Sequence, residues 1–170
     1  MVYTSRTHFL LWLLLALLLI TVDQAVKYGV SVWLPLHGSV EVTPWFNLVH
    51  VLNPGAAFSF LAHVGGWQRY FFTLLGLGVC GLLLFWLWRG LSSRLETVAY
   101  IGLIGGALGN VLDRIRIGAV VDYLDLHWQG WHWPAFNLAD VFVIGGAALL
   151  VFASACPGHS GDIPAQGASA

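Results

Sequence analysis

Four long apolar runs are the feature of this sequence that most constrains its fold. They cover residues 9–22, 70–88, 97–112 and 141–155, and none of them contains a charged side chain. A helix of about 20 apolar residues is long enough to cross the hydrocarbon core of a bilayer. The first run continues past Asp23 to Lys27, and residues 135–140 can extend the last one. The sequence therefore predicts four membrane-spanning helices.

The start of the chain also has the pattern of a cleaved signal peptide, because a basic residue precedes a Leu-rich stretch. A signal peptide needs small neutral residues at its cleavage site, however, and Asp23 and Lys27 stand there instead. We therefore expect residues 9–27 to stay as the first helix.

The composition agrees with a membrane protein. Only 9% of the 170 residues are charged, against roughly 25% in a typical soluble domain. The formal net charge of −1 creates no field for a polyanion. These values exclude a soluble enzyme, a disordered chain and a basic nucleic-acid binder. We expect one membrane domain over residues 1–156 and a disordered, Gly/Ser/Ala/Pro-rich cytoplasmic tail over residues 157–170.

Four spans place both termini on one side of the membrane and the long links, residues 28–69 and 113–139, on the other. A count of Lys and Arg does not orient the chain, because three lie on the side of the termini and four on the side of the long links. The latter are mixed with carboxylates, which indicates a polar site and not an orientation signal. We therefore expect cytoplasmic termini.

Glycines four residues apart mark the third apolar run. Gly102 and Gly106 form one such pair, and Gly105 and Gly109 another. Small residues at this spacing allow helix backbones to approach closely in lipid. The sequence predicts that this helix is tightly packed, with the Gly145–Gly146 pair serving the fourth helix in the same way.

The aspartates gather on the side of the long links. All those that precede the tail are expected there: Asp23, Asp113, Asp122, Asp125 and Asp140. Ionisable groups beside hydrocarbon are costly and tend to mark function. Structural explanations remain open for several residues of this face. Asp23 and Lys27 can form an ion pair at a helix end, Asp113 and Arg114 can cap the third helix, and Asn110 and Asn137 can hydrogen-bond between helices.

Carboxylates are the catalytic groups that this face offers. The sequence has no GxSxG motif, and His127 and His132 lie outside any zinc motif, so no metal or cofactor is expected. Two aspartates within hydrogen-bond reach share one proton, so that one acts as a base on water and the other as an acid on the substrate. We expect Asp122 and Asp140 to form this pair.

The surroundings of the two aspartates differ in the way that such a pair requires. Residues 120–126 alternate as in a strand, which places Asp122 on one side with apolar neighbours and Asp125 on the other. An apolar neighbourhood keeps a carboxyl protonated. Asp140 begins a helix, where free backbone N–H groups stabilise a carboxylate.

Five segments of the chain resemble the lipoprotein signal peptidases, the bacterial type II signal peptidase family. They are DQAVK at 23–27, NPGAAFSF at 53–60, GGALGNVLDR at 105–114, VVDY at 120–123 and PAFNLAD at 134–140. Their order and spacing make the resemblance specific, although Pro54 is a small departure from the family pattern.

The resemblance implies an all-α membrane protein of four transmembrane helices, with a small periplasmic β-cradle built largely from the first long link. It places the protein in the bacterial inner membrane as a multi-pass protein, with both termini cytoplasmic and the active site at the periplasmic face. Asp122 and Asp140 match the catalytic pair. The family positions that orient the pair and the substrate correspond here to Asn53, Gly55, Asn110, Arg114 and Asn137. Asp23 and Lys27 correspond to family positions that support the fold or the substrate.

The activity implied is that of an aspartic endopeptidase that uses no metal or cofactor. Its substrates are diacylglyceryl-modified prolipoproteins, from which it removes the signal peptide just before the lipid-modified cysteine. The implied partners also include membrane lipids and globomycin-like inhibitors, and no nucleic acid.

Two other functions fit parts of the pattern. A carboxylate-lined channel or secondary transporter uses acidic and basic residues within spans as ion relays, and a non-enzymatic assembly subunit needs the Asn and Gly residues only for packing. The polar residues gather at one face and leave the middle of the membrane clear, and no repeat is visible. These features favour the peptidase.

Overall fold

The computed structural model describes residues 5–55, 66–91 and 93–155. Within them the chain forms α1 (Arg6–Trp33), α2 (Gln68–Arg89), α3 (Arg94–Ile117) and α4 (Leu138–Ala155), each long and apolar enough to cross a membrane. The prediction of four such helices is confirmed. The expected tail at 157–170 and residues 56–60 of the NPGAAFSF motif lie outside the described residues.

Helix α3 lies at the centre of the bundle. It packs against α1, α2 and α4, and half of its most apolar 18-residue window is buried, against 11% in each of the other three helices. The outer helices therefore present their apolar side chains to lipid, as a bilayer requires. Of the charged side chains on α3, Asp113 is buried, whereas Arg94 and Arg116 at its two ends are exposed.

The helix ends differ from the expected ones. Helix α1 continues to Trp33, so Asp23 and Lys27 lie inside it and not at its end. The predicted ion pair is present, with Lys27 Nζ 2.9 Å from Asp23 Oδ2, but its expected position at the helix end is wrong. Helix α3 continues past Arg114 to Ile117 and stops at Gly118, which takes a left-handed conformation with φ of 80° that glycine adopts without strain.

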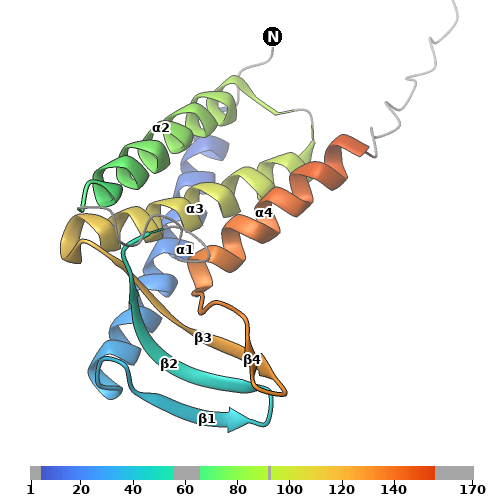
Figure 1. The fold of residues 1–170 in the computed structure, drawn as a ribbon. Helices are drawn as coiled ribbons and strands as arrows, with labels where there is room; N and C mark the ends of the chain where they lie inside the picture. Colours follow the sequence, from blue (N-terminus) through green and yellow to red (C-terminus); the bar gives the residue numbers. More distant parts are fainter. Residues whose placement is uncertain (1–4, 56–65, 92, 156–170) are drawn as a thin grey trace, which may run out of the picture.

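A four-stranded antiparallel sheet in the order β1-β2-β3-β4 covers one end of the bundle (Figure 1). Its strands are β1 (Ser39–Thr43), β2 (Phe46–Asn53), β3 (Val120–Trp128) and β4 (Trp131–His132). The first long link supplies β1 and β2, and the link over residues 113–139 supplies β3 and β4, so the sheet is built from both links and not largely from the first. Strand β3 pairs with β2 so that Asp122 lies opposite Val51.

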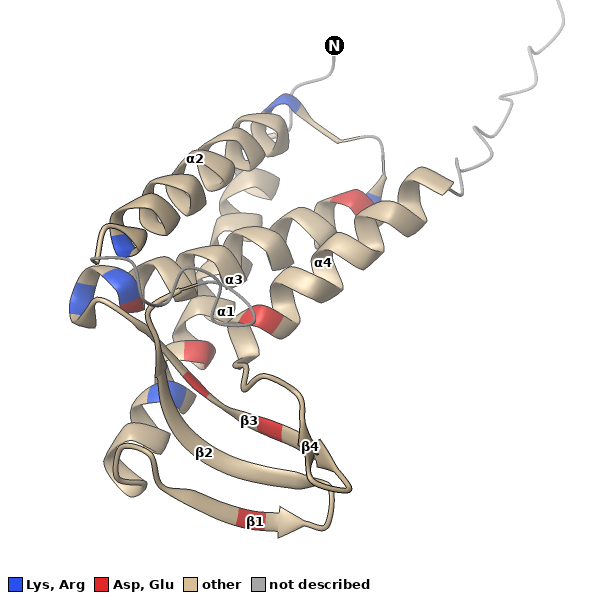
Figure 2. Cartoon of the chain, in the orientation of Figure 1, with Lys and Arg blue, Asp and Glu red and all other residues tan. Residues whose placement is uncertain are grey.

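Most acidic residues lie at the sheet end of the bundle (Figure 2). The start of α1, the connection between α2 and α3, and the end of α4 lie at the opposite end (Figure 1). This arrangement agrees with the expectation that the two long links share one face.

The glycines of α3 form the predicted close contacts. A methyl group on Gly102 would meet the backbone oxygen of Phe142 at 3.2 Å, and one on Gly105 would meet Leu19 of α1 at 2.9 Å. Gly146 fits against the backbone oxygen of Ala99. The prediction is wrong for Gly145, because a methyl group added there would meet no other part of the described structure within 4 Å.

We expect Gly106→Ala to destabilise the protein by about 1–3 kcal/mol, as overpacking does. The added methyl group would collide with the backbone oxygen of Ala139 and with the side chain of Val143, so α3 and α4 must separate. Thermal unfolding in detergent measures the loss. Gly78→Ala on α2 is the matched control, because nothing lies within 4 Å of its new methyl group. Equal melting temperatures in the two variants would contradict the described helix contact.

Candidate active site

Asp122 and Asp140 line the same cavity. Asp122 comes from β3 and Asp140 from the first turn of α4, and the cavity has a volume of about 630 Å³. Most of the remaining lining is apolar and includes Val120, Leu126, Trp133, Phe136, Val141 and Ile144. Val141 is 44% exposed and Ile144 is 68% exposed on α4, so one wall of the cavity belongs to the lipid-facing surface.

Two asparagines join the carboxylates. Asn137 is fully buried, and its Nδ2 donates to Asp122 Oδ1 over 2.6 Å and to Asn110 Oδ1 over 3.2 Å. Asn110 Nδ2 in turn donates to Asp140 Oδ1 over 2.8 Å. The two amides therefore fix the position of each carboxylate relative to the other.

Asn137 also begins helix α4. Its Oδ1 accepts from the backbone N of Asp140 over 2.9 Å, and its own backbone N donates to Asp140 Oδ2 over 3.2 Å. This reciprocal pair has the geometry of a capping box. Both Asp140 oxygens thus accept hydrogen bonds, which suits a carboxylate.

The other sequence-predicted site residues surround the pair. Asn53 ends β2, and its Nδ2 donates to Asp122 Oδ2 over 3.0 Å while its Oδ1 accepts from the backbone N of Gly55 over 3.0 Å. Arg114 donates to the backbone oxygen of Gly55 over 2.9 Å and to that of Asn110 over 3.3 Å. Gly55 therefore contributes backbone groups that connect Asn53 to Arg114.

The surroundings of Asp122 favour its protonated form. Burial and the neighbouring Asp140 carboxylate raise the pKa of Asp122 from 3.8 to about 7, although hydrogen bonds from Asn53 and Asn137 act against the rise. Its side chain is 2% exposed. A proton is therefore available on Asp122 near neutral pH.

Asp23 and Lys27 lie behind the pair, inside the protein. Lys27 Nζ is 2.9 Å from Asp23 Oδ2, 2.9 Å from Asp113 Oδ2 and 2.8 Å from Asn110 Oδ1. The sequence predicts Asp113 only as a possible helix cap and gives no role to Gln24, but Gln24 Nε2 donates to Asp113 Oδ1 over 2.9 Å. Both residues stand inside matched motifs, DQAVK and GGALGNVLDR, which was the available signal.

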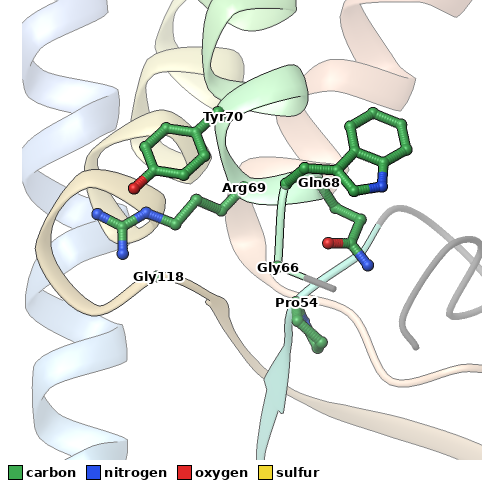
Figure 3. Close-up of a pocket in the computed structure, with 7 residues that line it drawn as sticks. Pro54, Gly66, Gln68, Arg69, Tyr70 and Gly118 are labelled. Atoms are coloured by element: carbon green, nitrogen blue, oxygen red, sulfur yellow. The ribbon is translucent and has the colours of Figure 1, made fainter. Parts of the chain in front are cut away.

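Arg69, which the sequence places on the same face, lines a different cavity of about 420 Å³ (Figure 3). Its guanidinium lies 5.0 Å over the ring of Tyr70. Gly118 and Pro54 also line this cavity, and none of its lining residues in the described part of the chain carries a carboxylate. Arg69 is therefore not part of the aspartate site.

Asp125 is also separate from the pair, as the strand alternation predicts. Its carboxylate accepts from Asn47 Nδ2 over 2.9 Å and lies 2.9 Å from His132 Nδ1. Within residues 5–55, 66–91 and 93–155, no three His, Cys, Asp or Glu side chains come together as a metal site would require.

Comparison with known proteins identifies the family. The model of the family described as signal peptidase (SPase) II matches residues 15–156. A lipoprotein signal peptidase of Aeromonas hydrophila is 56% identical over 87% of this chain and 90% of its own length. One from Janthinobacterium sp. (strain Marseille) is 45% identical over 88% of this chain and 91% of its own.

Solved structures agree with the sequence relatives. A bacterial membrane enzyme determined by the in meso method at 2.3 Å resolution aligns with a TM-score of 0.78 and 26% identity, over 99% of both chains. A second, at 1.9 Å, has a TM-score of 0.76 and 27% identity, over 91% of this chain and 97% of its own. The fold, the match over residues 15–156 and the relatives together show that this multi-pass membrane protein belongs to the signal peptidase II family.

Proposed function

We propose that this protein is a membrane aspartic endopeptidase that removes the signal peptide from diacylglyceryl-modified prolipoproteins, cutting just before the lipid-modified cysteine. The observation that carries the proposal is the placement of Asp122 and Asp140 on one largely apolar cavity, connected through Asn137 and Asn110. The names of the relatives, lipoprotein signal peptidases, support this substrate class. Family membership decides against the channel or transporter.

The pair provides a base and an acid in one site. Asp140, as the carboxylate, takes a proton from water, and the water oxygen attacks the scissile carbonyl carbon. Asp122, as the acid, gives its proton to the carbonyl oxygen. The tetrahedral intermediate then collapses as one of its hydroxyl groups returns a proton to Asp122. The C–N bond breaks, and the amine of the cysteine leaves with the proton that Asp140 took from water. The products are the signal peptide and the mature lipoprotein.

The position of the cavity suits a substrate held by lipid. Its apolar lining can take acyl chains or an apolar signal peptide, while Asn53, Asn110 and Arg114 supply polar groups for a peptide backbone. We assign the sheet end to the periplasmic face of the inner membrane and both termini to the cytoplasm. Residues 1–156 form the peptidase domain, and residues 157–170 follow as a cytoplasmic tail.

The direct test is cleavage by the purified protein in detergent. A diacylglyceryl-modified precursor peptide should be shortened at the bond before the modified cysteine, which mass spectrometry of the products locates. The matched control is the same precursor without the diacylglyceryl group, which we expect to remain uncut. Cleavage of both precursors at equal rates, or of neither, would contradict the proposed substrate.

The rate of cleavage should fall as the pH rises through about 7. The pKa of Asp122 is raised to about 7 by burial and by Asp140, so at higher pH the folded enzyme loses the proton that the acid must donate. Below this value Asp122 keeps the proton that it must donate. The dependence of kcat on pH measures the effect. A rate that increases steadily from pH 6 to pH 9 would rule out this assignment of acid and base.

A further inference from the structure

We propose that Asp113 is a positioning residue that sets Asp122 and Asp140 relative to each other; this rests on the proposed catalytic pair. Asp113 lies near the end of α3 and is 4% exposed. It does not line the cavity that holds the pair. Its carboxylate instead receives hydrogen bonds from two different elements, and each of these leads to one of the two catalytic aspartates.

The first connection leads to Asp122. Asp113 Oδ2 accepts from the backbone N of Val121 over 3.2 Å. Val121 immediately precedes Asp122 on β3 and lies opposite Leu52 of β2. Because adjacent residues of a strand share a rigid peptide plane, a fixed Val121 amide fixes the backbone from which the Asp122 side chain projects. Asp113 thereby ties this end of the sheet to α3.

The second connection leads to Asp140. Asp113 Oδ2 is 2.9 Å from Lys27 Nζ, and Lys27 Nζ donates to Asn110 Oδ1 over 2.8 Å. An ammonium group is only a donor, so the oxygen of the Asn110 amide must face it. The Asn110 nitrogen is then directed to Asp140 Oδ1, at 2.8 Å. A rotated Asn110 amide would present an oxygen to the Asp140 carboxylate and repel it.

Charge neutralisation alone does not explain Asp113. Lys27 already has a buried partner, Asp23, whose Oδ2 lies at 2.9 Å and whose side chain is fully buried. A second buried carboxylate adds a desolvation cost without a second cation in contact with it. What Asp113 adds is a link between three parts of the fold, namely α1 through Lys27 and Gln24, α3 by its own backbone, and β3 through Val121.

The test is Asp113→Asn in the full-length protein, compared with Asp125→Asn. Both are buried aspartates, and Asp125 lies on the same strand as Asp122 but bonds to Asn47 and His132, outside the catalytic pair. We expect Asp113→Asn to lower kcat about 10- to 100-fold, since small misplacements of catalytic groups have effects of this size. Its KM and melting temperature should stay close to those of the wild type, and Asp125→Asn should keep wild-type kcat.

The pH dependence of kcat separates positioning from loss of folded protein. A smaller fraction of folded enzyme lowers the rate equally at every pH. A pair held less closely has a weaker interaction between its carboxylates, so the alkaline limb of the profile should move to lower pH in Asp113→Asn. A variant with the wild-type kcat, or with a lower kcat and an unmoved alkaline limb, would overturn the proposal.

A second variant covers the case in which Asp113→Asn does not fold. Gln24→Met removes the donor to Asp113 Oδ1 and leaves every charge in place. We expect it to fold and to show a smaller loss of kcat with the same shift of the alkaline limb. Wild-type kcat and pH dependence in this variant would overturn the proposal. The proposed pair itself is tested separately: full activity of Asp122→Asn or Asp140→Asn would reject the pair, whatever Asp113→Asn does.

Discussion

Replacing either aspartate of the pair with asparagine, as Asp122→Asn or Asp140→Asn, is expected to reduce cleavage more than ~10²-fold, the lower range for loss of general acid–base catalysis. An amide can neither take a proton from water nor give one to the carbonyl, although it fills the same space. The measurement is the rate of cleavage of a diacylglyceryl precursor by each purified variant.

The folded state of these variants is checked by thermal unfolding in the same detergent. Asp122 accepts from the amides of Asn53 and Asn137, and an asparagine in its place keeps the same volume and one accepting oxygen. We therefore expect melting temperatures near that of the wild type. Asp125→Asn is the matched control and should remain active. A folded Asp122→Asn or Asp140→Asn variant with full activity would exclude the residue from catalysis.

Arg114→Lys should reduce turnover about tenfold or more, with a smaller effect on the melting temperature, and Arg114→Ala should reduce turnover further. The guanidinium donates to the backbone oxygens of Gly55 and Asn110 and lies 5.3 Å over the ring of Phe72. A lysine retains the charge but cannot donate in two directions from one plane. The loss corresponds to about 1.4 kcal/mol or more of transition-state stabilisation.

The matched control is Arg69→Lys, because Arg69 lies at the neighbouring cavity and does not line the one that holds the pair. We expect its cleavage rate to equal that of the wild type. If Arg114→Lys also cleaves at the wild-type rate, then Arg114 serves only as an interfacial anchor, for which length and charge suffice.

The fold was largely predictable because lipid restricts the choices of the chain. A continuous apolar run such as residues 70–88 must satisfy its backbone hydrogen bonds internally in a bilayer, which favours a helix. Helix α2 covers Gln68–Arg89 as this predicts. The end of α1 was not predictable. Asp23 and Lys27 interrupt the apolar run, but they neutralise each other and bond to α3, so the helix continues to Trp33.

The placement of Asp122 and Asp140 on one cavity could be predicted because their residue type and their local surroundings single them out. Asp122 stands in an alternating strand and Asp140 at the start of a helix. The role of Asp113 could not be found in this way. It depends on contacts with Lys27, 86 residues earlier in the chain, and with the backbone of Val121. A local sequence pattern does not indicate which backbone amide will donate a hydrogen bond to a carboxylate from another part of the fold.

The exposed wall of the cavity determines how a substrate reaches the enzyme. Val141 and Ile144 line the cavity and also lie on the lipid-facing surface of α4, so the site is open sideways, toward the bilayer. A substrate held by two acyl chains diffuses in that plane and does not cross water to arrive. The concentration that governs the rate is then the mole fraction of substrate in the lipid or detergent phase. We therefore expect added detergent to slow cleavage by surface dilution, even when the number of substrate molecules per millilitre is constant.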